Sequence, residues 1–202
     1  KLLTVAREQA RTLGAEFWTV IAEYHLARSL MLANRPDEAR PLLDEVRAAW
    51  STNATANRDR LADLYRTQAE IDLLQGNVAE ARASIDKSLA EFGYPQADPA
   101  PFLSAALTAA ARIYAKAGQL NEAESFAAAA LKVSEGIARD PRQSADVGEA
   151  LLVLASVKRA RGDNTAAQSH VARAVEALSN SLGEEHRLTR DAQSLRTALN
   201  TA

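Results

Sequence analysis

The sequence contains no cysteine, few aromatic residues, and little glycine or proline. Without cysteine the chain can form no disulfide, use no thiol nucleophile and build no cysteine-ligated zinc site. Gly and Pro number 8 and 6 among 202 residues, and aromatic residues make up 5%. Alanine is the commonest residue and favours helices, whereas glycine and proline interrupt them, so the composition predicts an all-α chain.

Neither sign of charge dominates, and no long apolar run is present. Lys and Arg number 24 against 26 Asp and Glu, which gives a net charge of -2. Binding to a phosphate backbone requires a basic surface, so we expect no nucleic-acid partner. The longest apolar run, at 150–157, is far shorter than the roughly 20 residues that cross a bilayer, so we expect no membrane contact by this segment.

An internal repeat organises the chain. Gly76, Gly118 and Gly162 each precede an alanine by five residues, and Asn34 repeats this spacing. Intervals of about 42 residues between such turns are typical of helical-repeat proteins. A further alanine stands seven residues before each turn, where a small side chain lets two helices approach closely.

We therefore expect an all-α, right-handed α–α superhelix of four helical hairpins, at residues 16–50, 57–91, 101–137 and 144–179. Half repeats are expected at both ends, at 1–13 and 187–200. The connections are too short for domain linkers, so residues 1–202 should form a single solenoid domain. Because the sequence begins at Lys1 and its only methionine is Met31, we expect it to be a fragment of a longer protein.

These features resemble the tetratricopeptide repeat (TPR). The turn glycine and the alanine seven residues earlier are accompanied by the pairs Glu38-Ala39, Glu80-Ala81 and Glu122-Ala123. The 42-residue period and the segment at 182–186, Leu-Gly-Glu-Glu-His, are similar to the kinesin-light-chain subtype, in which Pro41 also fits. Arg187 replaces the proline expected after the histidine, and Asn34 replaces the first turn glycine.

The resemblance implies a non-catalytic scaffold that binds a protein or peptide. Such arrays serve as sensor or interaction modules of larger bacterial signalling proteins, for example the C-terminal region of a transmembrane Ser/Thr kinase. The compartment stays open, with an extracytoplasmic, periplasmic location favoured over the cytoplasm. Two alternatives are a small-molecule or peptide-pheromone sensor in a cytosolic regulator and a self-association module that forms a homodimer through a terminal half repeat. A small-molecule sensor predicts a closed apolar pocket near Met31, Leu73 and Trp18.

In the resembled family the first helix of each hairpin lines a concave groove, which implies candidates three, six and ten residues before each turn. With Lys116, which flanks them, these are Tyr24, Arg28, Met31, Arg66, Glu70, Leu73, Thr108, Arg112, Ala115, Leu152, Ser156 and Arg159. The arginines could pair with carboxylates of an extended peptide, so reversing Arg28, Arg66 and Arg112 to Glu should weaken binding without unfolding the chain. The alternative is an ordinary solvated helix face, in which Arg66 and Glu70 form an i, i+4 pair.

No catalytic motif is present, so we expect no enzyme activity, no cofactor and no metal site. His25, His170 and His186 are too far apart to suggest a metal site. Trp18 and Trp50 are expected to anchor hairpin packing. Asp72 and Lys158 fall on otherwise apolar faces, and we expect their helices to be rotated so that both groups reach solvent.

Overall fold

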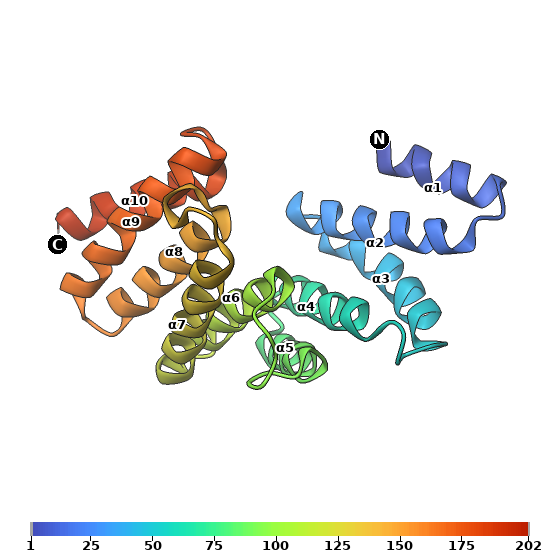
Figure 1. Ribbon diagram of the computed structural model, residues 1–202, viewed down its shortest axis with the longest axis horizontal. Helices are drawn as coiled ribbons and strands as arrows, with labels where there is room; N and C mark the ends of the chain where they lie inside the picture. The colour runs from blue at the N-terminus through green and yellow to red at the C-terminus, as the bar shows by residue number, and fades with distance from the viewer. Residues whose placement is uncertain (1, 202) are drawn as a thin grey trace. The chain divides into compact units, whose positions relative to one another are not determined.

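The computed structural model describes residues 2–201, and over these residues the protein consists of ten α-helices and one short 3-10 helix, with no β-strand (Figure 1). Helices adjacent in sequence pack as pairs. This confirms the expected all-α fold of helical hairpins. The chain divides into two compact units, Lys1–Pro95 (unit 1) and Gln96–Ala202 (unit 2). The single domain expected from the sequence stays a prediction.

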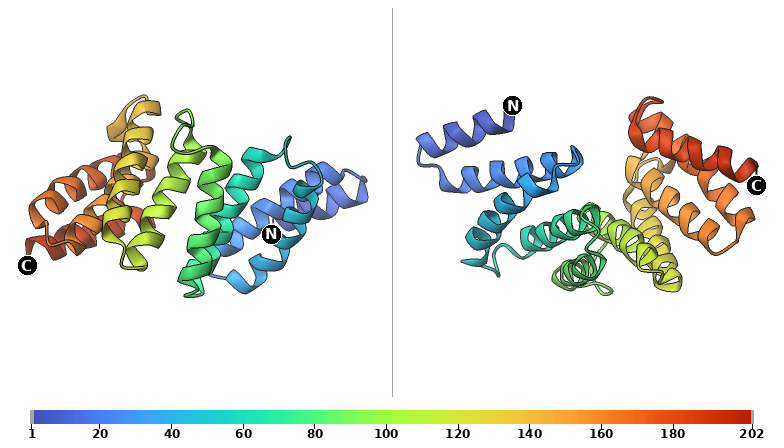
Figure 2. Two further views of the ribbon diagram at one scale, coloured as in Figure 1. Left: turned by 90° about the horizontal axis from the view of Figure 1, so that it is seen from below. Right: turned by 180° about the vertical axis from the view of Figure 1, so that it is seen from behind.

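Unit 1 consists of a lone helix followed by two hairpins. The lone helix α1 (Leu2–Thr12) packs on α2 (Glu16–Leu32), which pairs with α3 (Pro36–Ser51). The second hairpin consists of α4 (Arg58–Leu74) and α5 (Val78–Phe92). Helix α4 also packs on α3, so each hairpin is stacked on the one before it (Figure 2).

Unit 2 has the reverse arrangement, two hairpins followed by a lone helix. Its first hairpin joins α6 and α7, its second joins α8 and α9, and α10 packs on α9. The bounds are α6 (Pro101–Lys116), α7 (Leu120–Ile137), a 3-10 turn η1 (Pro141–Gln143), α8 (Ala145–Ala160), α9 (Asn164–Leu182) and α10 (Arg187–Asn200).

Each hairpin turns through a residue with a left-handed backbone. Gly76 has a φ of +81°, and Asn34, which replaces a glycine, has a φ of +57°. Around Gly76, two backbone N–H groups donate to carbonyls of the last turn of α4, and the same pattern recurs around Asn34. Asparagine tolerates this conformation better than most residues with a side chain, so the first hairpin keeps the turn of the others.

The small residues at fixed distances from these turns mark the closest helix packing. The alanines seven residues before the turns are fully buried, as are the four alanines five residues after them: Ala27, Ala69, Ala111 and Ala155, then Ala39, Ala81, Ala123 and Ala167. This confirms the packing role expected from the repeat. Larger side chains complete each core, with Leu43 and Val46 in unit 1 and Val171 and Leu178 in unit 2.

The α8–α9 pair makes one especially close approach at Gly148, which is buried in the first turn of α8. A Cβ atom added there would lie 2.6 Å from Cγ of Leu178 on α9. The two backbones can approach this closely only because Gly148 has no side chain.

Candidate functional site

Helix α2 carries three of the expected groove residues, and two of them are buried. Tyr24 and Met31 expose 5% and 7% of their surface. The Tyr24 hydroxyl lies 2.5 Å from Oδ2 of Asp63 and 3.0 Å from Oγ1 of Thr67 on α4. Burial and the nearby Asp63 carboxylate raise the pKa of Tyr24 above its ordinary range. Tyr24 and Met31 therefore belong to the core of unit 1, which corrects the expectation that they line an open groove.

Arg66 on α4 is buried as well. Its guanidinium lies 2.6 Å from Oδ1 of Asp63 and 2.7 Å from Oε2 of Glu70. Burial disfavours the charged guanidinium, but the carboxylates of Glu70 and Asp63 outweigh it and raise the pKa of Arg66. Arg28, whose side chain is about one-third exposed, completes the cluster, with Nη1 3.8 Å from Oδ2 of Asp63. The expectation of exposed arginines is thus wrong for Arg66, whose charge is balanced inside the protein.

A different set of α2 residues faces solvent. Trp18, His25, Ser29 and Leu32 are exposed, and the spacing of three to seven residues places them on one side of the helix. Trp18 is 63% exposed, which corrects its expected role as a packing anchor, whereas Trp50 is buried against Tyr24. The exposed residues stand two, five, nine and sixteen positions before the turn at Asn34, and a helical projection of α2 with Ala27 facing inward could have found them.

In unit 2, five of the expected residues, Arg112, Ala115, Lys116, Leu152 and Ser156, line a pocket of about 520 Å³ between α6, α8 and α10. Its apolar lining comes from all three helices: Ala115, Leu152, Val153, Val157, Leu188 and Leu195. Arg159, also expected in the groove, is exposed on α8 but does not line this pocket.

Helix α10 contributes residues that the sequence reasoning missed. Arg187 and Asp191 border the pocket together with its two leucines, and Glu149 on α8 was missed as well. The sequence could have predicted the contribution of α10, because this helix occupies the place of the first helix in a fifth repeat. Extending the groove positions into the half repeat would have included it.

Charges surround the apolar lining, and most are already paired. Arg112 Nη1 lies 2.7 Å from Oε1 of Glu149, and Arg187 lies 3.4 Å from Asp191. Lys116 is exposed and forms no hydrogen bond or ion pair with any other residue between 2 and 201. The pocket therefore combines an apolar interior with one uncompensated positive charge, which suits a ligand that is apolar and carries a negative group.

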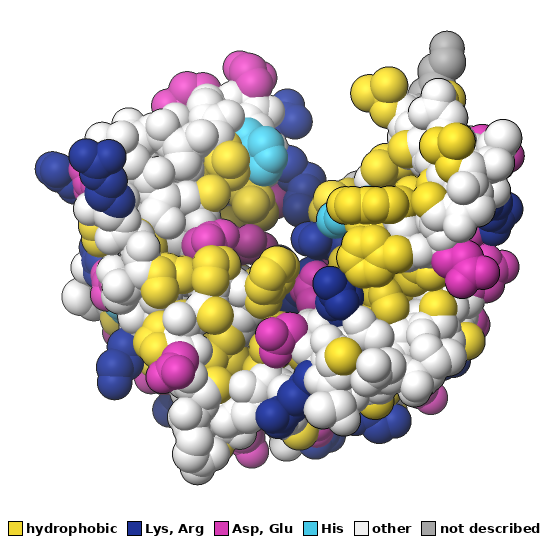
Figure 3. All heavy atoms as spheres, turned by 45° about the vertical axis from the view of Figure 1, so that its right-hand side comes forward, with side chains coloured by type: hydrophobic (Ala, Val, Ile, Leu, Met, Phe, Trp, Pro, Cys, Tyr) yellow, Lys and Arg dark blue, Asp and Glu magenta, His cyan; other side chains and the backbone are white. Residues whose placement is uncertain are grey.

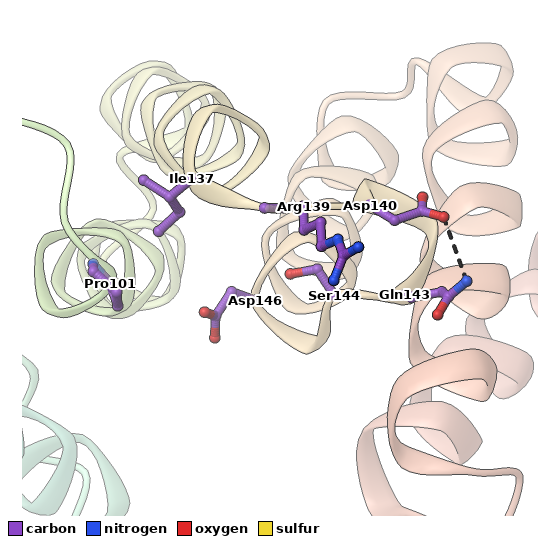
Figure 4. A pocket seen from close by; sticks show the side chains of 8 residues that line it. Pro101, Ile137, Arg139, Asp140, Gln143, Ser144 and Asp146 are labelled. Carbon is purple, nitrogen blue, oxygen red and sulfur yellow. Dashed lines mark hydrogen bonds between the residues drawn. The ribbon is translucent and has the colours of Figure 1, made fainter.

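A second cavity of unit 2, about 790 Å³, lies where α7 is connected to α8 (Figure 4). Pro101, Ile137 and Ala138 line it, together with the polar residues Arg139, Asp140, Gln143, Ser144 and Asp146. Asp140 accepts hydrogen bonds from the backbone and side chain of Arg142, which lower its pKa. Partial burial and the neighbouring Glu149 raise the pKa of Asp146. Five of the eight residues that line this cavity are polar.

Asp72 and Lys158, the two charged residues expected to reach solvent from apolar helix faces, differ in their exposure. Asp72 is buried and accepts a hydrogen bond of 2.6 Å from Nη2 of Arg40, so the expectation that it reaches solvent is wrong. Lys158 keeps partial exposure, and its Nζ lies 2.7 Å from Oε1 of Glu124. Both groups tie neighbouring helices together.

The described part of the chain offers neither a cluster of metal ligands nor a helix suited to crossing a membrane. Within residues 2–201 no cluster of three or more His, Cys, Asp or Glu side chains is placed to hold a metal ion. None of the helices in that range combines the length and the apolar character needed to span a bilayer.

The comparisons with known proteins concern the fold. No protein-family model and no curated protein matches the sequence. The crystal structure of BtubC (BKLC) from P. vanneervenii superposes with a TM-score of 0.79 at 17% identity, over 98% of this chain and 80% of that one. Two crystal structures of a Podosopora anserina putative kinesin light chain with nearly identical TPR-like repeats give TM-scores of 0.70 at 19% identity, over 90% of this chain and 85% of theirs. The protein thus has the fold of TPR-like helical-repeat proteins of the kinesin-light-chain kind.

Proposed function

We propose that the chain is a non-catalytic scaffold that binds a segment of another protein, with the pocket between α6, α8 and α10 receiving one side chain of that segment. The observation that carries the proposal is the apolar pocket bordered by Lys116, which has no partner within residues 2–201. The fold supports it, because TPR-like repeats generally serve as protein-interaction scaffolds.

The pocket chemistry indicates what the bound segment should contain. Leu152, Leu188 and Leu195 present aliphatic surface, so the inserted side chain should be apolar. Arg112 is already neutralised by Glu149, which leaves Lys116 as the cation to which a carboxylate of the ligand can bind. At about 520 Å³ the pocket can accept one large side chain with part of its backbone.

Binding of synthetic peptides to the intact chain tests this proposal. The probes are two fluorescent peptides with a central leucine, flanked by glutamates in one and by serines in the other. We expect tighter binding of the glutamate peptide and loss of that preference in Lys116→Glu, because the replacement repels the carboxylate.

Ser156→Trp should weaken binding of the glutamate peptide by at least about tenfold, since an indole would fill the pocket. The matched control is Ser194→Trp, because Ser194 is exposed on α10 and does not line the pocket. Equal affinities for Ser156→Trp and the unchanged protein would show that the pocket is not the binding site.

The wider role stays a prediction from the sequence resemblance. A scaffold of this kind can act as the interaction or sensor module of a larger signalling protein, and the proposed peptide site would then be its input. The open reading frame that surrounds this sequence tests the idea, because a kinase domain followed by one membrane-spanning helix is expected before the repeats.

A further inference from the structure

The cavity at the connection between α7 and α8 has a wall that hydrogen bonds hold in one conformation. Asp140 accepts hydrogen bonds from the backbone N–H of Arg142, over 3.0 Å, and from Nε2 of Gln143, over 3.4 Å (Figure 4). The turn η1 packs on α9, where Nδ2 of Asn180 donates to the carbonyl oxygen of Arg142 over 3.0 Å. Ser144 caps the first turn of α8 with its side chain. The connection therefore has its shape before any ligand binds.

Two opposite charges line this cavity without a partner. Arg139 lies in the connection and Asp146 in the first turn of α8, and both side chains are exposed. Neither forms a hydrogen bond or an ion pair with any residue between 2 and 201, and the two are too far apart to pair with each other. The third charged residue of the lining, Asp140, is neutralised by Arg142. The cavity thus offers one unpaired cation and one unpaired anion.

Apolar surface lies beside these charges. Pro101 at the start of α6, Ile137 at the end of α7 and the adjoining Ala138 complete the lining. In Figure 4, Pro101 and Ile137 lie to one side of Arg139 and Asp146. A ligand whose two charges are close together can therefore extend an apolar group from them onto this surface.

We propose that this cavity binds a free amino acid with an apolar side chain. Arg139 donates hydrogen bonds to its carboxylate, Asp146 accepts hydrogen bonds from its ammonium group, and its side chain lies against Ile137 and Pro101. The inference goes beyond the proposed function, because the cavity and the pocket between α6, α8 and α10 share no lining residue.

The charges of the cavity favour a ligand that carries both signs. A simple anion would meet the carboxylate of Asp146, and a simple cation would meet the guanidinium of Arg139, so each would gain one attraction and suffer one repulsion. Acidic and basic side chains are interspersed over the face of the molecule drawn in Figure 3, and the net charge of the chain is -2. The surface there thus has no strong field of one sign, which suits a ligand without net charge.

The size of the cavity sets the strength and the breadth of binding. At about 790 Å³ it has more room than one amino acid fills, so large apolar side chains can enter and water remains beside them. A ligand of about ten non-hydrogen atoms held mainly by two exposed charges should have a dissociation constant on the order of 1 mM.

Titration of the full chain with three related compounds, followed by the amide signals in nuclear magnetic resonance spectra, tests the proposal. L-leucine should shift the signals of residues 137–146. N-acetyl-L-leucine lacks the ammonium group and L-leucinamide lacks the carboxylate, so each should bind at least about fivefold more weakly.

Two variants assign each charge to its partner. Arg139→Gln should weaken binding of leucine at least about fivefold but leave binding of leucinamide unchanged, because leucinamide has no carboxylate. Asp146→Asn should weaken binding of leucine to a similar extent and leave binding of N-acetyl-leucine unchanged. Arg159→Gln is the matched control, since Arg159 is exposed on α8 outside the cavity, and it should bind all three compounds as the unchanged protein does.

Three results would each overturn the proposal: no shift of these signals at about 10 mM leucine, equal affinity for the three compounds, or the same loss in both variants for every compound. The peptide assay separates this inference from the proposed function. Arg139→Gln should bind the glutamate peptide normally, because Arg139 does not line the pocket that receives it.

Discussion

At the residue scale, the buried guanidinium of Arg66 holds unit 1 together through charge. It lies between the carboxylates of Asp63 and Glu70, and Asp63 also accepts a hydrogen bond from the hydroxyl of Tyr24 on α2. Two charges taken out of water are tolerated only when their partners remain in place. Removing Arg66 would take away the cation nearest to the buried Asp63 carboxylate, which lies 2.6 Å from it.

We therefore expect Arg66→Met to lower the free energy of unfolding of unit 1 by about 3 kcal/mol, because the replacement keeps the side-chain bulk but not the charge. Urea unfolding followed by tryptophan fluorescence measures this. Arg28→Met is the control: Arg28 is one-third exposed and lies at the edge of the cluster, so its loss should cost well under about 1 kcal/mol. Equal stability of the two variants would contradict a structural role for the buried charge.

The sequence could indicate that Arg66 and Glu70 pair, since residues four apart on a helix are neighbours. It could not indicate that the pair is buried, because burial depends on where α2 crosses α4 and brings Tyr24 to Asp63. The charge reversal first expected to weaken binding at Arg66 should instead unfold unit 1. A charged residue in a single sequence looks the same whether it faces a ligand or the core.

At the scale of helices, the hairpin turns were the most predictable feature. Glycine, or asparagine at position 34, is required where the backbone has a positive φ, so the turns leave a direct mark in the sequence. The rotation of each helix about its axis, which decides which residues are buried, is harder to predict from the sequence. Successive residues are 100° apart, so an error of one position exchanges the buried Tyr24 for the exposed His25. For the same reason the pocket residues of α8 were found only in part.

The close approach of α8 and α9 gives a test at this scale. Gly148→Ala should destabilise unit 2 by about 2 kcal/mol, because the added Cβ would lie 2.6 Å from Cγ of Leu178 and the helices must move apart. Gly136→Ala is the matched control, since Gly136 lies in α7 and nothing would be within 4 Å of its new Cβ. That change should be neutral or stabilising by up to about 1 kcal/mol, because alanine favours the helix. Chemical denaturation followed by circular dichroism measures the free energy of unfolding of both variants. If both substitutions lowered it, the packing argument would be refuted.

At the scale of the whole molecule, each unit has a hydrophobic core of its own. The core of unit 1 centres on Tyr24, Leu43 and Trp50, and that of unit 2 on Leu151, Val171 and Leu178. The period in the sequence predicts repeats but marks no boundary between units, because each repeat carries the same turn and the same small residues. Where contacts become sparse along a repeat array depends on side chains at every helix crossing.

The two tryptophans allow the units to be followed separately. Trp18 and Trp50 both lie in unit 1 and are the only tryptophans in the sequence, so their fluorescence reports on unit 1, whereas circular dichroism reports on the helices of both units. In Gly148→Ala, part of the circular dichroism signal should be lost at a lower urea concentration than the fluorescence change, because only the core of unit 2 is weakened. In Arg66→Met the order should reverse, with fluorescence changing first. If fluorescence and circular dichroism change at the same urea concentration in both variants, the chain unfolds as one cooperative body. The two compact units would then differ in their internal contacts but would not unfold separately.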